Sequence, residues 1–196
     1  MLGPGAMPAD RLRALMRRPS QGLIGLVLAL ALVGVAGCGG EEELHEAEEG
    51  VPIGVGDLEF NVQFTRFLNP TDAEDSEYLA GQRVPPPTGQ SYLAVFMTIE
   101  NTTDEEVRLP GEGQMDVVDT TGAAYEAIPS DTDFAVPLGT TLPGDEEVPE
   151  PGSAGATGPT EGAIVLFLVD REVSENRPLE LEIEHEGETG TVTLDV

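Results

Sequence analysis

The stretch LEFNVQFT, residues 58–65, alternates apolar and polar side chains along its whole length. Successive side chains of a β-strand point to opposite faces, so this period of two predicts a strand with one buried and one solvated face. Two further runs, YLAVFMTIE at 92–100 and AIVLFLV at 163–169, are apolar on both faces for most of their length. Such runs are typical of central strands that are covered on two sides.

Shorter strand candidates fill the rest of the chain after residue 50, where no segment has a helical apolar stripe. The chain closes on two alternating runs, 179–184 and 192–196, which predict a terminal hairpin around 186–190. The remaining candidates are separated by Gly, Pro and Asp and lie at 107–109, 115–119 and 124–128. Seven or eight strands of this kind predict an all-β, immunoglobulin-like antiparallel β-sandwich over residues 53–196.

The turns between these strands resemble those of a known family. NTTD at 101–104 follows the long apolar strand, DTTG at 119–122 leads to Tyr125, and a loop rich in Pro and Gly precedes GAIVLF at 162–167. In this order they resemble the telokin-like immunoprotective extracellular family, also called domain of unknown function forty-three fifty-two, over residues 55–196. The resemblance implies an immunoglobulin-like fold, a frequent lipobox and no established activity. Two long loops and strong acidity depart from the family pattern.

Residues 1–37 have the parts of a lipoprotein signal peptide. An apolar h-region spans 22–36, and a basic n-region before it contains Arg11, Arg13, Arg17 and Arg18. The quartet VAGC at 35–38 then resembles the lipobox of prokaryotic lipoproteins. That resemblance implies a diacylglycerol on the Cys38 sulfur and cleavage just before this residue. Cys38 is therefore the predicted site of lipid attachment and the predicted first residue of the mature chain.

An uncleaved membrane helix is the alternative for this segment, because residues 22–40 are nearly long enough to span a bilayer. The lipobox is favoured, since Cys38 is the only cysteine in the chain, falls at the cleavage spacing and follows small residues. Arg17-Arg18 is a weak twin-arginine signal. The starting residue stays open among Met1, Met7 and Met16.

A lipidated Cys38 places the mature chain at the extracytoplasmic face of the cell membrane. Two or three acyl chains anchor a protein stably, whereas one chain binds only reversibly. Residues 38–52 then form an acidic linker, which carries six Glu and is expected to stay extended by self-repulsion. With Cys38 acylated, no disulfide can form, so packing must stabilise the domain.

The net charge excludes a nucleic-acid partner. The chain has 9 Arg, no Lys and 37 Asp and Glu, which gives a formal net charge of −28. Residues 1–37 hold four of the Arg and one of the acids, or +3, so the remainder carries −31. Phosphate binding requires a basic surface, which this composition does not supply. Both a compositional bias of the genome and a salty habitat would explain the absence of Lys.

Two long loops are the places where a binding function is expected. The first, 69–89, contains Tyr78 and Arg83, residue types that are enriched in binding hot spots, and we predict that they contact a partner. The alternative for Tyr78 is that it covers the open end of the sandwich. The second loop, 142–161, consists largely of Gly, Pro, Ala, Thr and acids, and this composition predicts disorder.

The chemical inventory argues against an enzyme and against a bound cofactor. The only histidines are His45 in the linker and His185 at a strand end, where its register predicts a residue at the rim of the core. There is no second cysteine and no Gly-x-Ser-x-Gly elbow, so neither a Cys-His nor a serine-triad mechanism is indicated. Met97 and Met115 are expected in the core rather than as copper ligands.

The leading hypothesis is a lipid-anchored, non-catalytic binding module whose partner is a protein, a peptide or a component of the cell envelope. The first alternative is a calcium-binding envelope protein, because the oxygen ligands in 72–77 or 130–133 suit a hard cation. Neither segment has the spacing of an EF-hand. A remote alternative is a hydrolase that uses two carboxylates, for which the sequence selects no pair.

Overall fold

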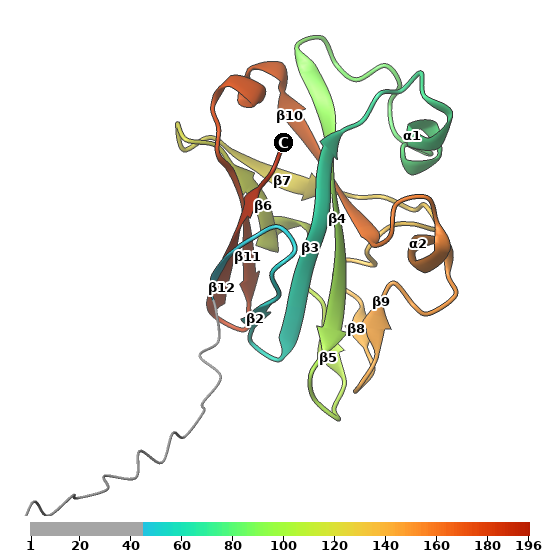
Figure 1. Ribbon diagram of the computed structural model, residues 1–196, viewed down its shortest axis with the longest axis vertical. Coiled ribbons are helices and arrows are strands. Elements are labelled where there is room, and N and C mark those ends of the chain that lie inside the picture. Colours follow the sequence, from blue (N-terminus) through green and yellow to red (C-terminus); the bar gives the residue numbers. More distant parts are fainter. Residues whose placement is uncertain (1–44) are drawn as a thin grey trace, which may run out of the picture. The chain divides into compact units, whose positions relative to one another are not determined.

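The computed structural model describes residues 45–196, which form a β-sandwich (Figure 1). The predicted signal peptide, Cys38 and linker residues 38–44 lie outside the described part. The all-β prediction is confirmed, but the described chain has twelve strands rather than seven or eight: β1 Glu46–Glu48, β2 Ile53–Val55, β3 Leu58–Phe67, β4 Gln90–Asn101, β5 Val107–Arg108, β6 Met115–Val118, β7 Ala124–Ile128, β8 Thr141–Leu142, β9 Glu147–Val148, β10 Ala163–Asp170, β11 Leu179–His185 and β12 Glu188–Leu194.

The long strands form two layers that share strand β7. One layer contains β2, β3, β4 and β10, and β9 pairs with β4 beyond the end of β10. The other layer contains β1, β12, β11 and β6. Strand β7 pairs with β6 and with β10 and thereby joins the layers. Figure 1 shows β3 and β4 in front of β6, β11 and β12. The predicted terminal hairpin is confirmed, since β11 pairs with β12 from Leu179↔Leu194 to His185↔Glu188.

Two short α-helices and two short 3₁₀ helices complete the described chain. They are α1 Ala73–Tyr78, η1 Glu112–Gln114, α2 Ala154–Thr157 and η2 Arg171–Glu175. In Figure 1, α1 and α2 lie beside the β3–β4–β10 layer, on the side away from β11 and β12. Within residues 45–196, none of the helices has the length and apolar character needed to cross a membrane.

The main core lies between the layers and follows the predicted alternation of β3 as far as Val62. Leu58, Phe60 and Val62 are buried, but a register shift between Val62 and Phe64 interrupts the pairing with β4. A bulge of this kind adds one residue and reverses the faces that follow. Phe64 is therefore 42% exposed, whereas its neighbour Thr65 is buried on the core face.

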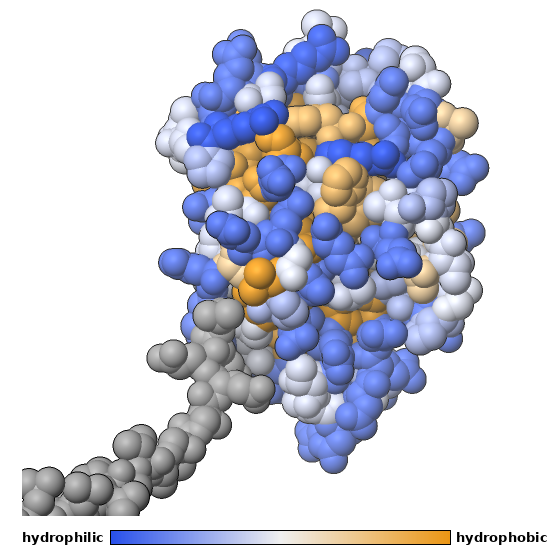
Figure 2. All heavy atoms as spheres, viewed as in Figure 1, coloured by the Kyte–Doolittle hydropathy of each residue, from blue (hydrophilic) through white to orange (hydrophobic). Residues whose placement is uncertain are grey.

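A second apolar cluster covers the outer face of β4 and β10. It includes Tyr92, Phe96, Ile164 and Leu166, with Tyr78 from α1 packed on top. Both faces of these two strands are thus buried, as their continuous apolar runs predict. Elsewhere hydrophilic side chains dominate the surface, and the face in Figure 2 shows apolar residues only as patches between them.

The linker ends earlier in the chain than predicted. Strand β1 pairs in parallel with β12 from Glu46↔Thr191 to Glu48↔Thr193, and the Thr191 N–H donates to the His45 carbonyl over 2.7 Å. Residues 45–52, expected in a flexible linker, are therefore part of the sandwich. Composition misleads here because the backbone of an acidic segment can still pair with a strand edge while its side chains point to solvent.

The segment 142–161 is ordered, so the predicted disorder is wrong. Strand β8 pairs with β5, and β9 pairs with β4 through Ile99↔Val148. The buried Asn101 side chain donates to the carbonyls of Leu142 and Pro143 over 3.2 and 3.0 Å. Composition alone misses this segment, because its order comes from long-range backbone and amide hydrogen bonds together with the burial of Leu142 and Val148 in the main core.

Gly190 provides a test of the packing between β12 and β2. A Cβ at this position would clash with Val55 Cγ2 and would lie 2.8 Å from Ile53 Cδ1. We predict that Gly190→Ala lowers the free energy of unfolding by about 1–3 kcal/mol, as overpacking of a core does. Urea unfolding followed by circular dichroism measures the effect. Gly113→Ala is the matched control, because its Cβ meets nothing within 4 Å. Equal midpoints for the two variants would contradict the packing described.

Candidate functional site

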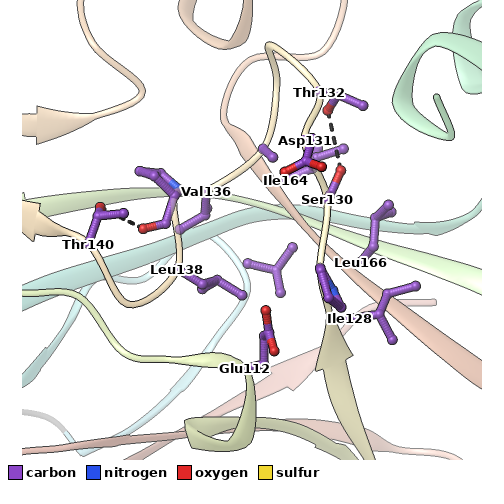
Figure 3. Close-up of a pocket in the computed structure, with 14 residues that line it drawn as sticks. Glu112, Ile128, Ser130, Asp131, Thr132, Val136, Leu138, Thr140, Ile164 and Leu166 are labelled. Atoms are coloured by element: carbon purple, nitrogen blue, oxygen red, sulfur yellow. Dashed lines mark hydrogen bonds between the residues drawn. The ribbon is translucent and has the colours of Figure 1, made fainter. Parts of the chain in front are cut away.

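A cavity of about 380 Å³ opens where β7 and β10 separate (Figure 3). The two strands pair only at Ala127↔Phe167 and Ile128↔Leu166. Pro129 follows at once, and a proline has no N–H to continue the ladder. The chain leaves the sheet there and returns at a parallel bridge between Ala135 and Ile164. The segment that leaves the sheet after Ile128 and the segment that returns to Ile164 form the two sides of the cavity.

Backbone hydrogen bonds fix the returning side. The Ile164 N–H donates to the Phe134 carbonyl over 2.7 Å, and the Val136 N–H donates to the Ile164 carbonyl over 2.9 Å. The Thr140 hydroxyl donates to the Pro137 carbonyl over 2.7 Å and closes the following turn. Because these bonds involve the backbone, the shape of the cavity does not depend on long flexible side chains.

The cavity combines apolar walls with a polar rim. Side chains of Ile128, Leu138 and Leu166 line it, and Figure 3 shows Glu112 entering from η1 between Ile128 and Leu138. The opposite rim carries Asp131 together with Ser130 and Thr132, whose hydroxyls lie 3.5 Å apart. Glu112 and Asp131 are both exposed to solvent. Polar and apolar atoms contribute about equally to the surface of the cavity, so a small molecule or side chain that fills it must match both.

Tyr78 is not available to a partner, so the predicted contact through this residue is wrong. Its side chain is 1% exposed, and its ring packs edge-on against Phe96 and Phe134 with centroids 5.4 and 4.9 Å apart. The Tyr78 hydroxyl donates to Glu74 Oε1 over 3.1 Å. Burial raises the pKa of the Tyr78 phenol. Tyr78 covers the outer face of the sheet rather than the open end of the sandwich.

Arg83 is exposed, as a partner contact requires, and its role stays a prediction. Its carbonyl accepts a hydrogen bond from the Tyr92 hydroxyl over 2.8 Å, which fixes the backbone. The preceding Gln82 amide donates to the Pro129 carbonyl over 2.6 Å. Pro129 lines the cavity, so the loop that carries Arg83 touches the edge of the candidate site.

The first calcium candidate, 72–77, is occupied by contacts within the protein. Asp72 caps α1 by accepting from the N–H groups of Glu74 and Asp75. Asp75 accepts from the Asn69 N–H over 2.7 Å and lies 2.7 Å from the Arg66 guanidinium, which also contacts Glu74. These carboxylates hold α1 against β3 and do not converge on an empty position.

The second calcium candidate, 130–133, is divided between two sites. Asp131 lines the cavity at 128–140, whereas Asp133 lines a separate depression beside Phe134. In the part of the chain that the structure describes, no three His, Cys, Asp or Glu side chains are grouped to hold a metal ion. The structure therefore does not build either segment into a ligand set.

The remaining candidate residues lie away from the cavity. Met97 and Met115 are fully buried in the main core, as predicted. His185 is 5% exposed at the end of β11, the rim position that its register predicts, and its Nε2 atom has no hydrogen-bond partner. Its ring lies beside Gly56, where an added Cβ would come within 2.9 Å of His185 Cδ2. None of these three residues lines the cavity.

One carboxylate with a shifted pKa, Asp116, lies on the outer face of the other layer. Asp116 on β6 lies opposite Glu126 on β7 and opposite Glu182 on β11. Burial, with the nearby charges of Glu126 and Glu184, raises the pKa of the Asp116 carboxyl. These side chains stand on an open strand face outside the cavity at 128–140, which gives the remote hydrolase alternative no enclosed site.

The sequence analysis missed Glu112, Leu138 and Thr140. Glu112 comes from the connection between β5 and β6, whereas Leu138 and Thr140 come from the connection between β7 and β8, and no local motif joins them. The available signal was the pair of prolines, Pro129 and Pro137, on either side of the candidate segment 130–133. Two such interruptions beside a predicted strand indicate that the chain leaves the sheet and returns.

Comparisons with known proteins do not assign a family. No family model matches the sequence, and a search of curated proteins gives no match. Solved structures of similar shape include an uncharacterised β-sandwich protein of Clostridium difficile 630, at 17% identity over 79% of this chain and 97% of that one, with a TM-score of 0.47. Others are the yjhA protein of Bacillus subtilis, at 12% identity over 76% and 99% with a TM-score of 0.47, and the secreted protein MPT63 of Mycobacterium tuberculosis, at 14% over 77% and 96% with a TM-score of 0.47.

Neutralising Asp116 tests the electrostatics of the outer face. Because its pKa is raised from 3.8, the charged carboxylate destabilises the folded state above the folded pKa, and this penalty disappears as pH falls through that value. We predict that Asp116→Asn raises the free energy of unfolding at pH 7 by roughly 0.2–1 kcal/mol, the range for cross-strand pairs. The gain should vanish near pH 3.

Urea titrations at several pH values measure this gain. The exposed Glu106→Gln is the control, since it removes one charge from the same acidic chain away from β6. A gain that is equal in both variants would show general charge repulsion rather than the local pairing of Asp116 with Glu126 and Glu182.

Proposed function

We propose that this chain is a lipid-anchored, extracytoplasmic binding module without catalytic activity, and that the cavity at 128–140 is its binding site. The observation that carries the proposal is the cavity itself, whose apolar walls are fixed by backbone hydrogen bonds and whose rim carries exposed Glu112 and Asp131. Its partner is a protein, a peptide or a component of the cell envelope.

Binding is favoured over catalysis by the residues that line the cavity. They include hydroxyl groups from Ser130, Thr132 and Thr140 but no His, Cys, Lys or Arg. A nucleophilic mechanism needs a base within hydrogen-bond reach of its nucleophile, and the cavity lining supplies no histidine for that role. The groups that are present can orient a ligand, which is sufficient for a binding site.

Membrane attachment through Cys38 is the second part of the proposal. It is supported by the basic n-region, the apolar h-region and the VAGC quartet at 35–38. The resemblance of the turns to the telokin-like immunoprotective extracellular family supports the same placement, because a lipobox often precedes that domain. In this arrangement the lipid holds the module at the membrane while the cavity binds its partner.

Replacing the cysteine tests the anchor. We predict that Cys38→Ser abolishes incorporation of labelled palmitate and leaves an uncleaved precursor of higher mass, because cleavage before residue 38 follows acylation of the cysteine. Immunoblotting measures the change in mass. Wild-type chain that has the same full length as Cys38→Ser would instead indicate the uncleaved membrane helix. Wild-type chain without label would contradict lipidation directly.

Filling the cavity tests the binding site. Thr140 is exposed, lines the cavity and donates its hydroxyl to a backbone carbonyl, so Thr140→Tyr should obstruct the site at modest structural cost. The matched control is Thr102→Tyr, since Thr102 is also exposed and donates to the Asp57 carbonyl over 3.0 Å.

Affinity purification from envelope extracts at low and high salt provides the measurement. We expect partners recovered with the wild type and with Thr102→Tyr to be lost with Thr140→Tyr, while the urea midpoints of both variants agree. Recovery with Thr140→Tyr at the wild-type level would remove the cavity as the binding site. Recovery of nothing above background in any sample would contradict a binding module.

A further inference from the structure

The rim of the cavity carries negative charge and no positive charge. Figure 3 shows Glu112 and Asp131 approaching the opening from opposite sides. No Lys, Arg or His lines the cavity, and both carboxylates are exposed to solvent. A ligand that brings a positive group to this opening would meet two carboxylates, whereas an anion would meet repulsion from both.

Two arginines belong to segments beside the cavity, Arg108 near the returning turn and Arg83 on the loop that contacts Pro129, and neither lines it. The Arg108 guanidinium lies 3.6 Å from the ideal Cβ position of Gly139. Arg108 itself does not line the cavity. Asp133, the next charged residue along the chain from Asp131, lines the separate depression beside Phe134 and does not belong to this rim. The local electrostatic environment therefore favours a positive ligand.

The size and walls of the cavity restrict the ligand further. Its volume of about 380 Å³ is near the lower end for binding sites of small molecules. Such a volume suits one apolar side chain rather than a large rigid ligand. The accessible apolar wall consists mainly of the half-buried Ile128 and Leu138, since Leu166 behind them is only 1% exposed. This wall would remove that side chain from water, and the open rim would leave an attached charge in contact with solvent.

We propose that the ligand is a basic, apolar segment of a protein or peptide. One apolar side chain of the segment occupies the space between Ile128, Leu138 and Leu166, and a neighbouring ammonium or guanidinium group lies between Glu112 and Asp131. This proposal rests on the proposed function and names the chemistry of its partner. Because the apolar walls and the charged rim belong to one small cavity, the apolar and positive groups must be adjacent in the ligand.

Three probes with the same isobutyl group test this chemistry: leucinamide, N-acetyl-leucinamide and N-acetyl-leucine. At pH 6.5 they are a cation, a neutral molecule and an anion, because an α-amino group has a pKa of about 7.7–8.0 and a carboxyl about 3.5. The full chain in nonionic detergent, labelled at Ile, Leu and Val methyl groups, reports binding by chemical-shift titration. Ile128, Leu138 and Leu166 are the reporters, and Leu194 in the main core is the reference.

We expect leucinamide to bind about 3- to 10-fold more tightly than N-acetyl-leucinamide, as two exposed ion pairs would give, and N-acetyl-leucine to bind most weakly. The preference should fall between about 20 and 300 mM salt. Glu112→Gln combined with Asp131→Asn should abolish it without altering the fold. Glu106→Gln combined with Glu175→Gln, which removes the same charge at exposed positions outside the cavity lining, should preserve it.

The possible results separate the two proposals. Equal binding of all three probes at the reporters would overturn the basic-ligand inference and leave the cavity as a binding site. A cation preference that survives Glu112→Gln with Asp131→Asn would also overturn the basic-ligand inference. The preference would then come from the net charge of the whole chain. No shift at Ile128, Leu138 or Leu166 with any probe would contradict the proposed binding site itself.

Discussion

Strands β4 and β10 are buried on both faces, and the rest of the described structure depends on this constraint. They pair without interruption from Ala163↔Met97 to Asp170↔Gln90. Their inner side chains join the main core, whereas the outer ones, including Phe96 and Leu166, form a cluster of their own. A sandwich of two layers covers only the inner face. The outer face must be covered by connections, and the segments 69–89 and 129–138 supply Tyr78, Leu79 and Phe134 to this cover.

The candidate site follows from the way in which these connections cover the outer face. Helix α1 is held by Arg66, whose guanidinium contacts Glu74 and Asp75 and lies 5.7 Å from the Tyr78 ring centroid. The segment after Pro129 covers the neighbouring surface with fewer apolar side chains and returns to Ile164 by only two backbone hydrogen bonds. The cavity lies where this second cover leaves the sheet, so its apolar walls are part of the surface that folding must bury.

Sequence reasoning succeeded where one local period decided the structure. The alternation at 58–62, the apolar runs of β4 and β10 and the terminal hairpin were predicted, because each pattern states directly which faces are buried. The predictions failed where the local structure depends on partners that are distant in the chain. The bulge after Val62, the pairing of β1 with β12 and the order of 142–161 depend on backbone groups far apart in the chain. Tyr78 was assigned to the surface because residue type alone does not reveal that Phe96 and Phe134 enclose it.

The net charge of −28 and the local charge at the cavity act over different distances. At physiological ionic strength the Debye length is about 8 Å, so most carboxylates of the sandwich contribute to the rate at which any cation approaches and little to where it stays. Glu112 and Asp131 stand beside the apolar walls of the cavity. A small inorganic cation gains nothing from Ile128 and Leu138, and an apolar molecule gains nothing from the carboxylates. Only a ligand that carries both groups uses the whole site, and this coupling would give an acidic protein selectivity among the many cations that its charge attracts.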